Sequence, residues 1–256
     1  MAFDTNNPSD ILEAQIKLRA DLNGDSAMWF MRGTQYAVVG LVATPLYHLV
    51  NGSFTRITKI AENNYQVRML ELSFYCDLKT GKPLRTFVNP FNKESCTMPH
   101  EVFGPNVVGL TLDGIQPPEN FPFGELTFDG NLGPAHNVGD DLWVREESLV
   151  RMTSDNPGFG NYIYNEIVNY RGSLSEVSNP DITNASATLD YHTTSNIRPW
   201  LKMDDIVGHL ESQAVGKKIA SVDEFPADYL EMAQELFPEF IADPIAVLDA
   251  PPKLPG

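Results

Sequence analysis

Phenolic and acidic side chains alternate with other residues in one stretch of the second half of the chain. In an extended strand, alternate positions face the same side, and this places on one face Tyr162, Tyr164, Glu166, Val168 and Tyr170. A carboxyl group among aromatic and apolar side chains is desolvated, which raises its pKa. Glu166 is therefore a candidate general acid or base near neutral pH. The alternative is an exterior Glu166 beside surface tyrosines.

Two histidine-containing pairs have a similar spacing. Asp190 and His192 share a face of the next expected strand, where the carboxylate can orient the imidazole and raise its basicity. His209, Glu211 and Gln213 share a face of the strand after that. The alternative for either group is a solvated exterior, so both assignments stay open.

Arginine, histidine and aromatic residues suggest how an aromatic ligand could be held. Arg85 alternates with Phe87 and Asn89, and an inward guanidinium could bind a phenolate or carboxylate. Arg198, near Trp200, could act likewise; the alternative is an arginine bonded to loop carbonyls. The expected catalytic residues are His192, Glu166, Arg85, His100 and Asp190. The expected substrate-binding residues are Arg198, Trp200, Tyr36, Tyr47, Tyr164, His209 and Asn89.

Several classes of protein are disfavoured. The sequence has no GxGxxG, P-loop, GxSxG or HExxH motif, so we expect no cofactor and no metal. Its 18 basic and 34 acidic residues give a net charge of −16, which repels nucleic acid and anionic lipid. No apolar segment reaches the roughly 20 residues that a bilayer requires, and the N-terminus does not resemble a signal peptide. With two cysteines, these features favour a soluble cytoplasmic protein, and a homo-oligomer is compatible with them.

The elements that must position these residues are mainly strands. Segments rich in Val, Ile, Phe, Tyr and Thr predict strands at 36–50, 54–60, 65–76, 83–88, 142–151, 162–170, 187–194 and 207–219. Asn51-Gly52 suits a type I′ hairpin, and 62–64 and 79–82 also suit turns. About eight strands in sequential antiparallel order predict a closed, calycin-like barrel around a small ligand.

The other segments complete a single domain over 1–242. Capping patterns predict a helix at 9–23, and an apolar stripe predicts another at 227–237. The Pro- and Gly-rich segment 89–141 is expected to hold few strands and to serve as a loop or lid. The Pro-rich tail 243–256 is expected to be extended or disordered.

Two sequence runs resemble a bacterial family known only as domain of unknown function 1838. The first is Leu-Arg-Thr-Phe-Val-Asn-Pro-Phe-Asn-Lys-Glu at 84–94, followed by His100. The second is Arg-Pro-Trp-Leu-Lys-Met at 198–203, with Gly-His-Leu at 208–210 and Gly-Lys-Lys at 216–218. The resemblance extends over about 29–240. Asn92-Lys93 replaces the usual Thr-Gly, and Arg198-Pro199 and Lys202 replace more apolar residues.

The resemblance implies degradation of plant-derived aromatic dimers, including formaldehyde-releasing lyases. The expected function is therefore a cofactor-independent lyase that cleaves a carbon–carbon bond of a phenolic dimer related to lignin. One alternative is a barrel that binds a hydrophobic aromatic ligand without turnover, in which Glu166 and His192 would point outward. A second alternative is a metal-dependent hydrolase, which requires His100, His192 and His209 to converge with a carboxylate.

Overall fold

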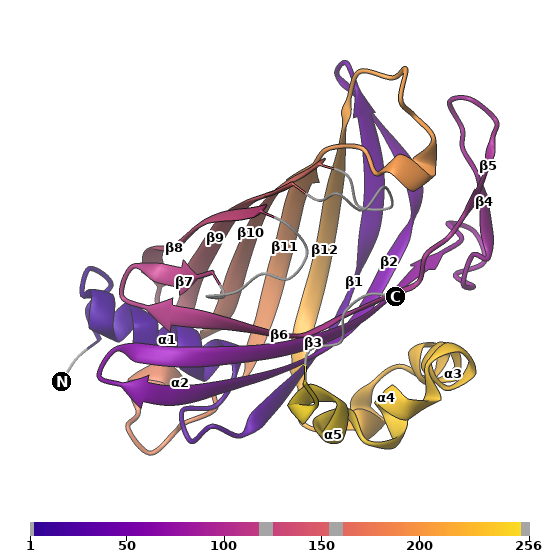
Figure 1. The fold of residues 1–256 in the computed structure, drawn as a ribbon. Coiled ribbons are helices and arrows are strands. Elements are labelled where there is room, and N and C mark those ends of the chain that lie inside the picture. The colour runs from indigo at the N-terminus through magenta and orange to yellow at the C-terminus, as the bar shows by residue number, and fades with distance from the viewer. Residues whose placement is uncertain (1–2, 118–124, 154–160, 252–256) are drawn as a thin grey trace.

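Long antiparallel strands dominate the chain, as Figure 1 shows for a computed structural model that describes residues 3–117, 125–153 and 161–251. Within these residues, ten strands form one sheet in the order β7-β6-β3-β2-β1-β12-β11-β10-β9-β8. They are β1 Ser26–Val39, β2 Val42–Ala61, β3 Asn64–Cys76, β6 Glu101–Thr111, β7 Gly114–Gln116, β8 Glu125–Val138, β9 Asp141–Thr153, β10 Asn161–Ser173, β11 Ala187–Ser195 and β12 His209–Ile219.

The sheet curls until its two edge strands meet. A Cβ atom placed on Gly114 of β7 would lie 2.5 Å from Cα of Asn131 in β8, and a Cβ on Gly130 would lie 2.9 Å from the carbonyl oxygen of Ile115. The edges thus touch through glycine-rich backbone and not through a continuous ladder of hydrogen bonds. The predicted antiparallel barrel is confirmed as a nearly closed one.

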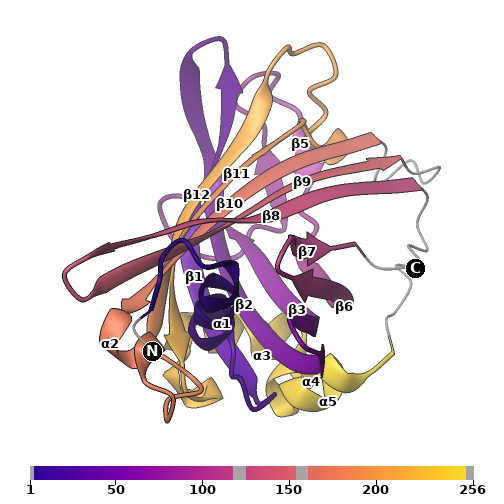
Figure 2. The same ribbon diagram turned by 90° about the vertical axis from the view of Figure 1, so that its left-hand side faces the viewer.

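One end of the barrel is filled by helix α1, Pro8–Arg19 (Figure 2). Ile11, Ala14 and Leu18 pack with residues of β9, β10 and β11, while Leu12 and Ile16 pack toward β2, β3 and β6. The predicted N-terminal helix is confirmed, although it ends four residues earlier than expected. Burial on nearly every side makes α1 a plug.

Three helices cover part of the outer surface: α3 Ala227–Leu236, α4 Pro238–Ala242 and α5 Pro244–Asp249 (Figure 1). The outward side chains of β1, β2 and β3 pack against them, including Phe54, Leu72 and Phe74. The predicted helix at 227–237 is confirmed. The expectation of an extended tail is wrong for 243–249, because the Asp243 side chain caps α5 and Leu248 is buried. Ala250 is extended, and residues 252–256 lie outside the described ranges.

Two turn and loop predictions are also wrong. Asn51-Gly52 lies within β2, and the hairpin occurs at Gly40-Leu41. Gly52 is required for packing instead, since a Cβ there would lie 2.2 Å from the Tyr229 hydroxyl oxygen. The segment 89–141 contains β5 (Ser95–Thr97), β6, β7 and β8, because short apolar runs between its prolines pair with β3 and β9.

The predicted strand at 83–88 does not enter the barrel. Its ordered part, β4 Thr86–Val88, pairs with β5 Ser95–Thr97 in a separate two-stranded ribbon beside the barrel (Figure 1). The remaining short elements are α2 Leu174–Ser178 and the 3₁₀ turns η1 Pro199–Leu201 and η2 Val222–Glu224. Among the helices described, none is both long and apolar enough to cross a bilayer.

Candidate functional site

The inward face of β10 carries the alternating residues singled out in the sequence. Glu166 pairs across the sheet with Ser148 of β9 and Thr193 of β11, whose side chains are buried. Because directly opposed residues share a face, Glu166 points into the barrel with Tyr162 and Tyr164 beside it. The predicted alternation is confirmed, and the exterior alternative for Glu166 is wrong.

Glu166 belongs to a hydrogen-bonded chain with two tyrosines. The Tyr164 hydroxyl donates to Glu166 Oε2, and the hydroxyl oxygens of Tyr164 and Tyr191 lie 2.7 Å apart. Burial raises the pKa of Glu166 to about 7, the Tyr164 hydrogen bond opposes this shift, and Glu146 and Glu71 add to it. Near neutral pH the carboxyl group is therefore present in both protonation states, as a proton donor or acceptor requires.

At the end of the lumen next to α1, an ion pair joins this helix to β9. Arg19 of α1 donates from NH1 to Oε2 of Glu146 at 2.6 Å, and Gln15, one turn earlier, donates to the same oxygen at 2.7 Å. The other end of the guanidinium lies 2.7 Å from the sulfur of Met69 on β3. Arg19 thus reaches from the β9 wall to the β3 wall.

The β2–β3 wall carries a second polar group. Asn51 donates to the Ser73 hydroxyl at 2.7 Å and to Glu71 Oε2 at 3.4 Å. Burial raises the pKa of Glu71, against the opposing effects of Arg19 and the Asn51 hydrogen bond. Phe103 of β6 is opposite Glu71 in the sheet register and is 40% exposed. An aromatic surface accessible to solvent therefore borders this carboxyl group.

The inward residues of the two halves of the barrel differ in their exposure to solvent. Near α1 the inward residues are fully buried, for example Leu142 and Val144. Farther from the plug, inward residues keep accessible surface, among them Glu71, Ser73, Tyr164, Glu166 and Tyr191. Solvent therefore reaches part of both residues, and we assign the candidate site to this half of the lumen.

The far end of the barrel brings the two family-like runs together. Asn89 Nδ2 donates to the Leu201 carbonyl oxygen at 2.7 Å and its Oδ1 accepts from the Phe91 amide, so Asn89 joins the ribbon to η1. The rings of Tyr47 and Tyr75 pack against that of Trp200, with ring centres 6.1 and 5.8 Å from its centre. Asn89 and Tyr47 are therefore structural parts of this end.

Arg198 lies beside the same opening. Its guanidinium carbon is 3.7 Å from the centre of the Tyr162 ring, and NH2 donates to the Tyr162 hydroxyl at 2.7 Å. Tyr162 is on the inward face of β10, and its ring stacks 5.7 Å from that of Tyr164. A positive charge thus lies at the rim, next to the tyrosines of the site.

The histidine and carboxylate pairs on β11 and β12 face away from the lumen. On β11 the inward positions are Leu189, Tyr191 and Thr193, so Asp190 and His192 point outward. On β12 His209 points outward as well, and its Nε2 lies 3.1 Å from Glu211. They therefore lie outside the lumen, because the residues between them occupy the inward face, and their expected catalytic and binding roles stay predictions.

Three further candidates lie outside the lumen. Arg85 is 86% exposed and pairs with Glu235 of α3 at 3.2 Å. His100 packs beside Phe74, whose ring faces Tyr229 on the outer wall, and burial lowers its pKa. Tyr36 lies on the outward face of β1, opposite Glu211. Arg85 directly precedes the ribbon, which leaves the barrel, and His100 lies between the ribbon and β6, which is why they miss the site.

Several interior polar residues were not predicted: Gln15, Arg19, Asn51, Glu71, Glu146 and Tyr191. A signal existed for two of them. Glu146 alternates with Leu142, Val144 and Ser148, and Glu71 alternates with Met69 and Ser73, the same pattern that pointed to Glu166. Arg19 and Gln15 share a helix face one turn apart, but their target could be known only from the fold.

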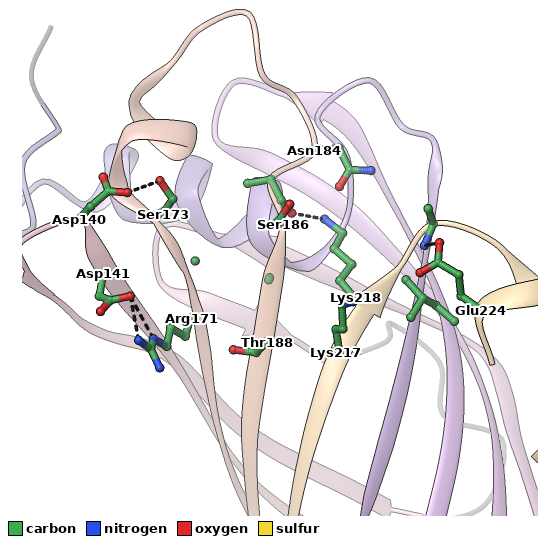
Figure 3. Close-up of a pocket in the computed structure, with 15 residues that line it drawn as sticks. Asp140, Asp141, Arg171, Ser173, Asn184, Ser186, Thr188, Lys217, Lys218 and Glu224 are labelled. Carbon is green, nitrogen blue, oxygen red and sulfur yellow. Dashed lines mark hydrogen bonds and ion pairs between the residues drawn. The ribbon is translucent and has the colours of Figure 1, made fainter. Parts of the chain in front are cut away.

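A groove outside the barrel is a second candidate, with a volume of about 710 Å³ between the ends of β10, β11 and β12 (Figure 3). Most of its charged groups are engaged with each other or with the backbone. Asp141 accepts from Arg171 at 2.9 Å, Asp140 accepts from Ser173 at 2.6 Å, and Lys218 donates to carbonyl oxygens of Lys17 and Ala20. Lys218 thereby satisfies the C-terminus of α1, and we regard the groove as structural.

The fold and site define a nearly closed antiparallel barrel with a buried acid–base cluster. Residues 153–253 match the model of a family described as "Protein of unknown function (DUF1838)", so this part of the chain resembles that family. The match contains Glu166, Tyr164 and Tyr191, whereas Arg19 and Glu71 precede it. No curated protein matches the chain.

Proposed function

We propose that the chain is a cofactor-independent lyase that cleaves a carbon–carbon bond of a phenolic aromatic dimer and releases formaldehyde. The observation that carries the proposal is Glu166, a carboxyl group with a pKa of about 7 inside an accessible lumen. A base of this strength, held by Tyr164, is suited to remove a proton from a substrate hydroxyl near neutral pH. The formaldehyde-releasing reaction is suggested by the family resemblance.

The lining of the lumen supports an aromatic substrate. Tyr162, Tyr164 and Tyr191 line one wall, and Phe103 lies across from them on β6. Aromatic rings bind such surfaces by burial of apolar area and by offset or edge-to-face packing. The carboxyl groups of Glu71, Glu146 and Glu166 outnumber Arg19, so the lumen favours an uncharged substrate over an anionic one.

The reaction can proceed without an oxidant. Glu166 takes the proton of a hydroxymethyl group, the oxygen forms a C=O bond, and the bond from this carbon to the next carbon breaks. The released electron pair forms a C=C bond with the following carbon, from which an oxygen leaving group departs and is protonated. Arg198 at the rim supplies positive charge for a phenolate of the substrate.

The test is to incubate purified protein with a diaryl dimer whose hydroxymethyl group is bonded to the carbon next to the one that bears the aryl ether oxygen. Formaldehyde and the new alkene should form in equal amounts. Glu166→Gln should reduce the rate by about 10²–10⁴-fold, while His192→Ala, which changes an outward residue, should leave it unchanged. Release of no formaldehyde from any such dimer would contradict the proposal.

The carrier alternative predicts binding without turnover. It expects Glu166 and His192 to point outward and the pocket to hold no titratable group with a shifted pKa. The raised pKa values of Glu166 and Glu71 differ from this expectation. The outward orientation of His192 agrees with it. For the hydrolase alternative, His100, His192 and His209 lie outside the lumen wall and do not converge. A cytoplasmic location and an oligomeric state remain predictions.

A further inference from the structure

Glu71 and Glu166 lie on opposite walls of the lumen at one level. Arg19 marks the level below them, since its guanidinium contacts Glu146 on β9 and Met69 on β3. One step farther from the plug, Glu71 follows Met69 along the inward face of β3. On the other wall, Glu166 is paired with Ser148, which follows Glu146 along the inward face of β9. Both residues keep accessible surface.

We propose that Glu71 is a second catalytic residue, the general acid that protonates the leaving oxygen while Glu166 removes the hydroxymethyl proton. This inference rests on the proposed function. The fragmentation requires a base at the hydroxymethyl oxygen and an acid at the leaving ether oxygen. Two carboxyl groups that face each other across the substrate fulfil both requirements without a cofactor.

The surroundings assign the two roles. Tyr164 donates a charge-assisted O–H···O bond to Glu166, which stabilises the carboxylate form. Glu71 receives a longer N–H···O contact of 3.4 Å from Asn51. Two carboxyl groups that repel each other share one proton most readily. The reactive form of the pair is the one in which this shared proton is on Glu71, and Glu166 is then the base, held as a carboxylate by Tyr164.

Glu146 is a poorer candidate for the acid. Its side chain is 3% exposed, and its Oε2 accepts from both Arg19 and Gln15. These two donors occupy this oxygen. The groups that face Glu71 from neighbouring elements are Arg19 on α1, Asn51 on β2, Glu166 on β10 and Tyr191 on β11, with Glu146 behind Arg19.

The test compares two dimers that differ in the acidity of the leaving phenol, one unsubstituted and one with a nitro group para to the ether oxygen. A general acid matters for the poor leaving group and little for the good one. Glu71→Gln should therefore slow the unsubstituted dimer by about 10²-fold or more and the nitro dimer by less than about threefold. Glu166→Gln should slow both, and Glu211→Gln, on the outer face, should slow neither.

A second measurement serves if Glu71→Gln does not fold. Asn51→Asp places another carboxyl group next to Glu71 and raises the pKa of the acid. The alkaline limb of the kcat/KM profile should then move to higher pH for the unsubstituted dimer only. If wild-type protein releases formaldehyde but neither variant distinguishes the two dimers, the role of Glu71 is wrong and the lyase proposal stands. If wild-type protein releases none, the lyase proposal itself is wrong.

Discussion

At the scale of single residues, the protonation of Glu166 links the site to stability. Its pKa is raised from 4.5 to about 7 in the folded chain, so the folded state binds more protons than the unfolded state between these values. The stability that this group contributes is fully present below pH 4.5 and is lost as the pH rises through about 7. The same burial that makes Glu166 a base near neutral pH thus weakens the fold there.

Glu166→Gln should remove this dependence. Relative to wild type, the variant should gain about 1–3 kcal/mol of unfolding free energy between pH 4.5 and pH 8, since each pKa unit corresponds to about 1.4 kcal/mol. Urea unfolding of both proteins at several pH values measures the difference. Glu211→Gln, on the outer face, is the matched control. A constant difference between Glu166→Gln and wild type across this range would contradict the assigned pKa.

At the scale of elements, α1 is attached to the wall through Arg19. Arg19→Met should destabilise the protein by about 3–5 kcal/mol, because it leaves the Glu146 carboxylate buried without its ion pair. Adding Glu146→Met should recover much of the loss, since the uncompensated charge is then gone. Denaturant unfolding of the two single variants and the double variant gives the coupling free energy. Additive losses would show that the ion pair does not join the plug to β9.

The outer helices depend on a glycine in the wall. Gly52→Ala should destabilise the protein by about 1–3 kcal/mol, because its Cβ would overlap the Tyr229 ring and push α3 off the barrel. Tyr229→Ala alone should also be destabilising, but the double variant should be more stable than the sum of the two losses predicts. Thermal unfolding of the three variants tests this, and strictly additive changes would contradict a direct contact.

These elements show what the sequence could and could not reveal. Alternation was sufficient for β10, where aromatic and acidic residues share one face, and it placed Glu166 and Tyr164 correctly. It failed for His192 because the pattern alone does not say which face of β11 is buried; Leu189, Tyr191 and Thr193 decide that. Asn51-Gly52 matches a turn motif, yet packing against Tyr229 overrides the local preference.

The site itself was only half predictable. Glu71 and Glu146 follow the same alternation as Glu166 and could have been found by applying it to every strand. Arg19 could not, because its partner is 127 residues away and depends on how α1 enters the barrel. Arg85 was misplaced because the place beside β3 in the sheet belongs to β6 and not to the strand next along the chain.

At the scale of the whole molecule, closure of the barrel depends on a seam between its two edge strands. The edge strands β7 and β8 meet where Gly114, at φ +101°, lies against the backbone of Gly130 and Asn131. A glycine tolerates this positive φ and leaves no side chain between the edges. The seam is therefore held by close packing and is the part of the barrel most readily opened.

Gly114→Ala should open this seam. The new Cβ cannot fit 2.5 Å from Asn131 Cα, and alanine is strained at this φ, so a loss of about 1–3 kcal/mol is expected from the two effects. Gly139→Ala is the matched control, because Gly139 also has a positive φ, +61°, but a Cβ there would meet nothing within 4 Å; it should lose only the strain part. Hydrogen exchange should show faster exchange in β7 and β8 of Gly114→Ala, with β1 and β2 unchanged. Equal losses and equal exchange in both variants would mean that the seam does not close the barrel.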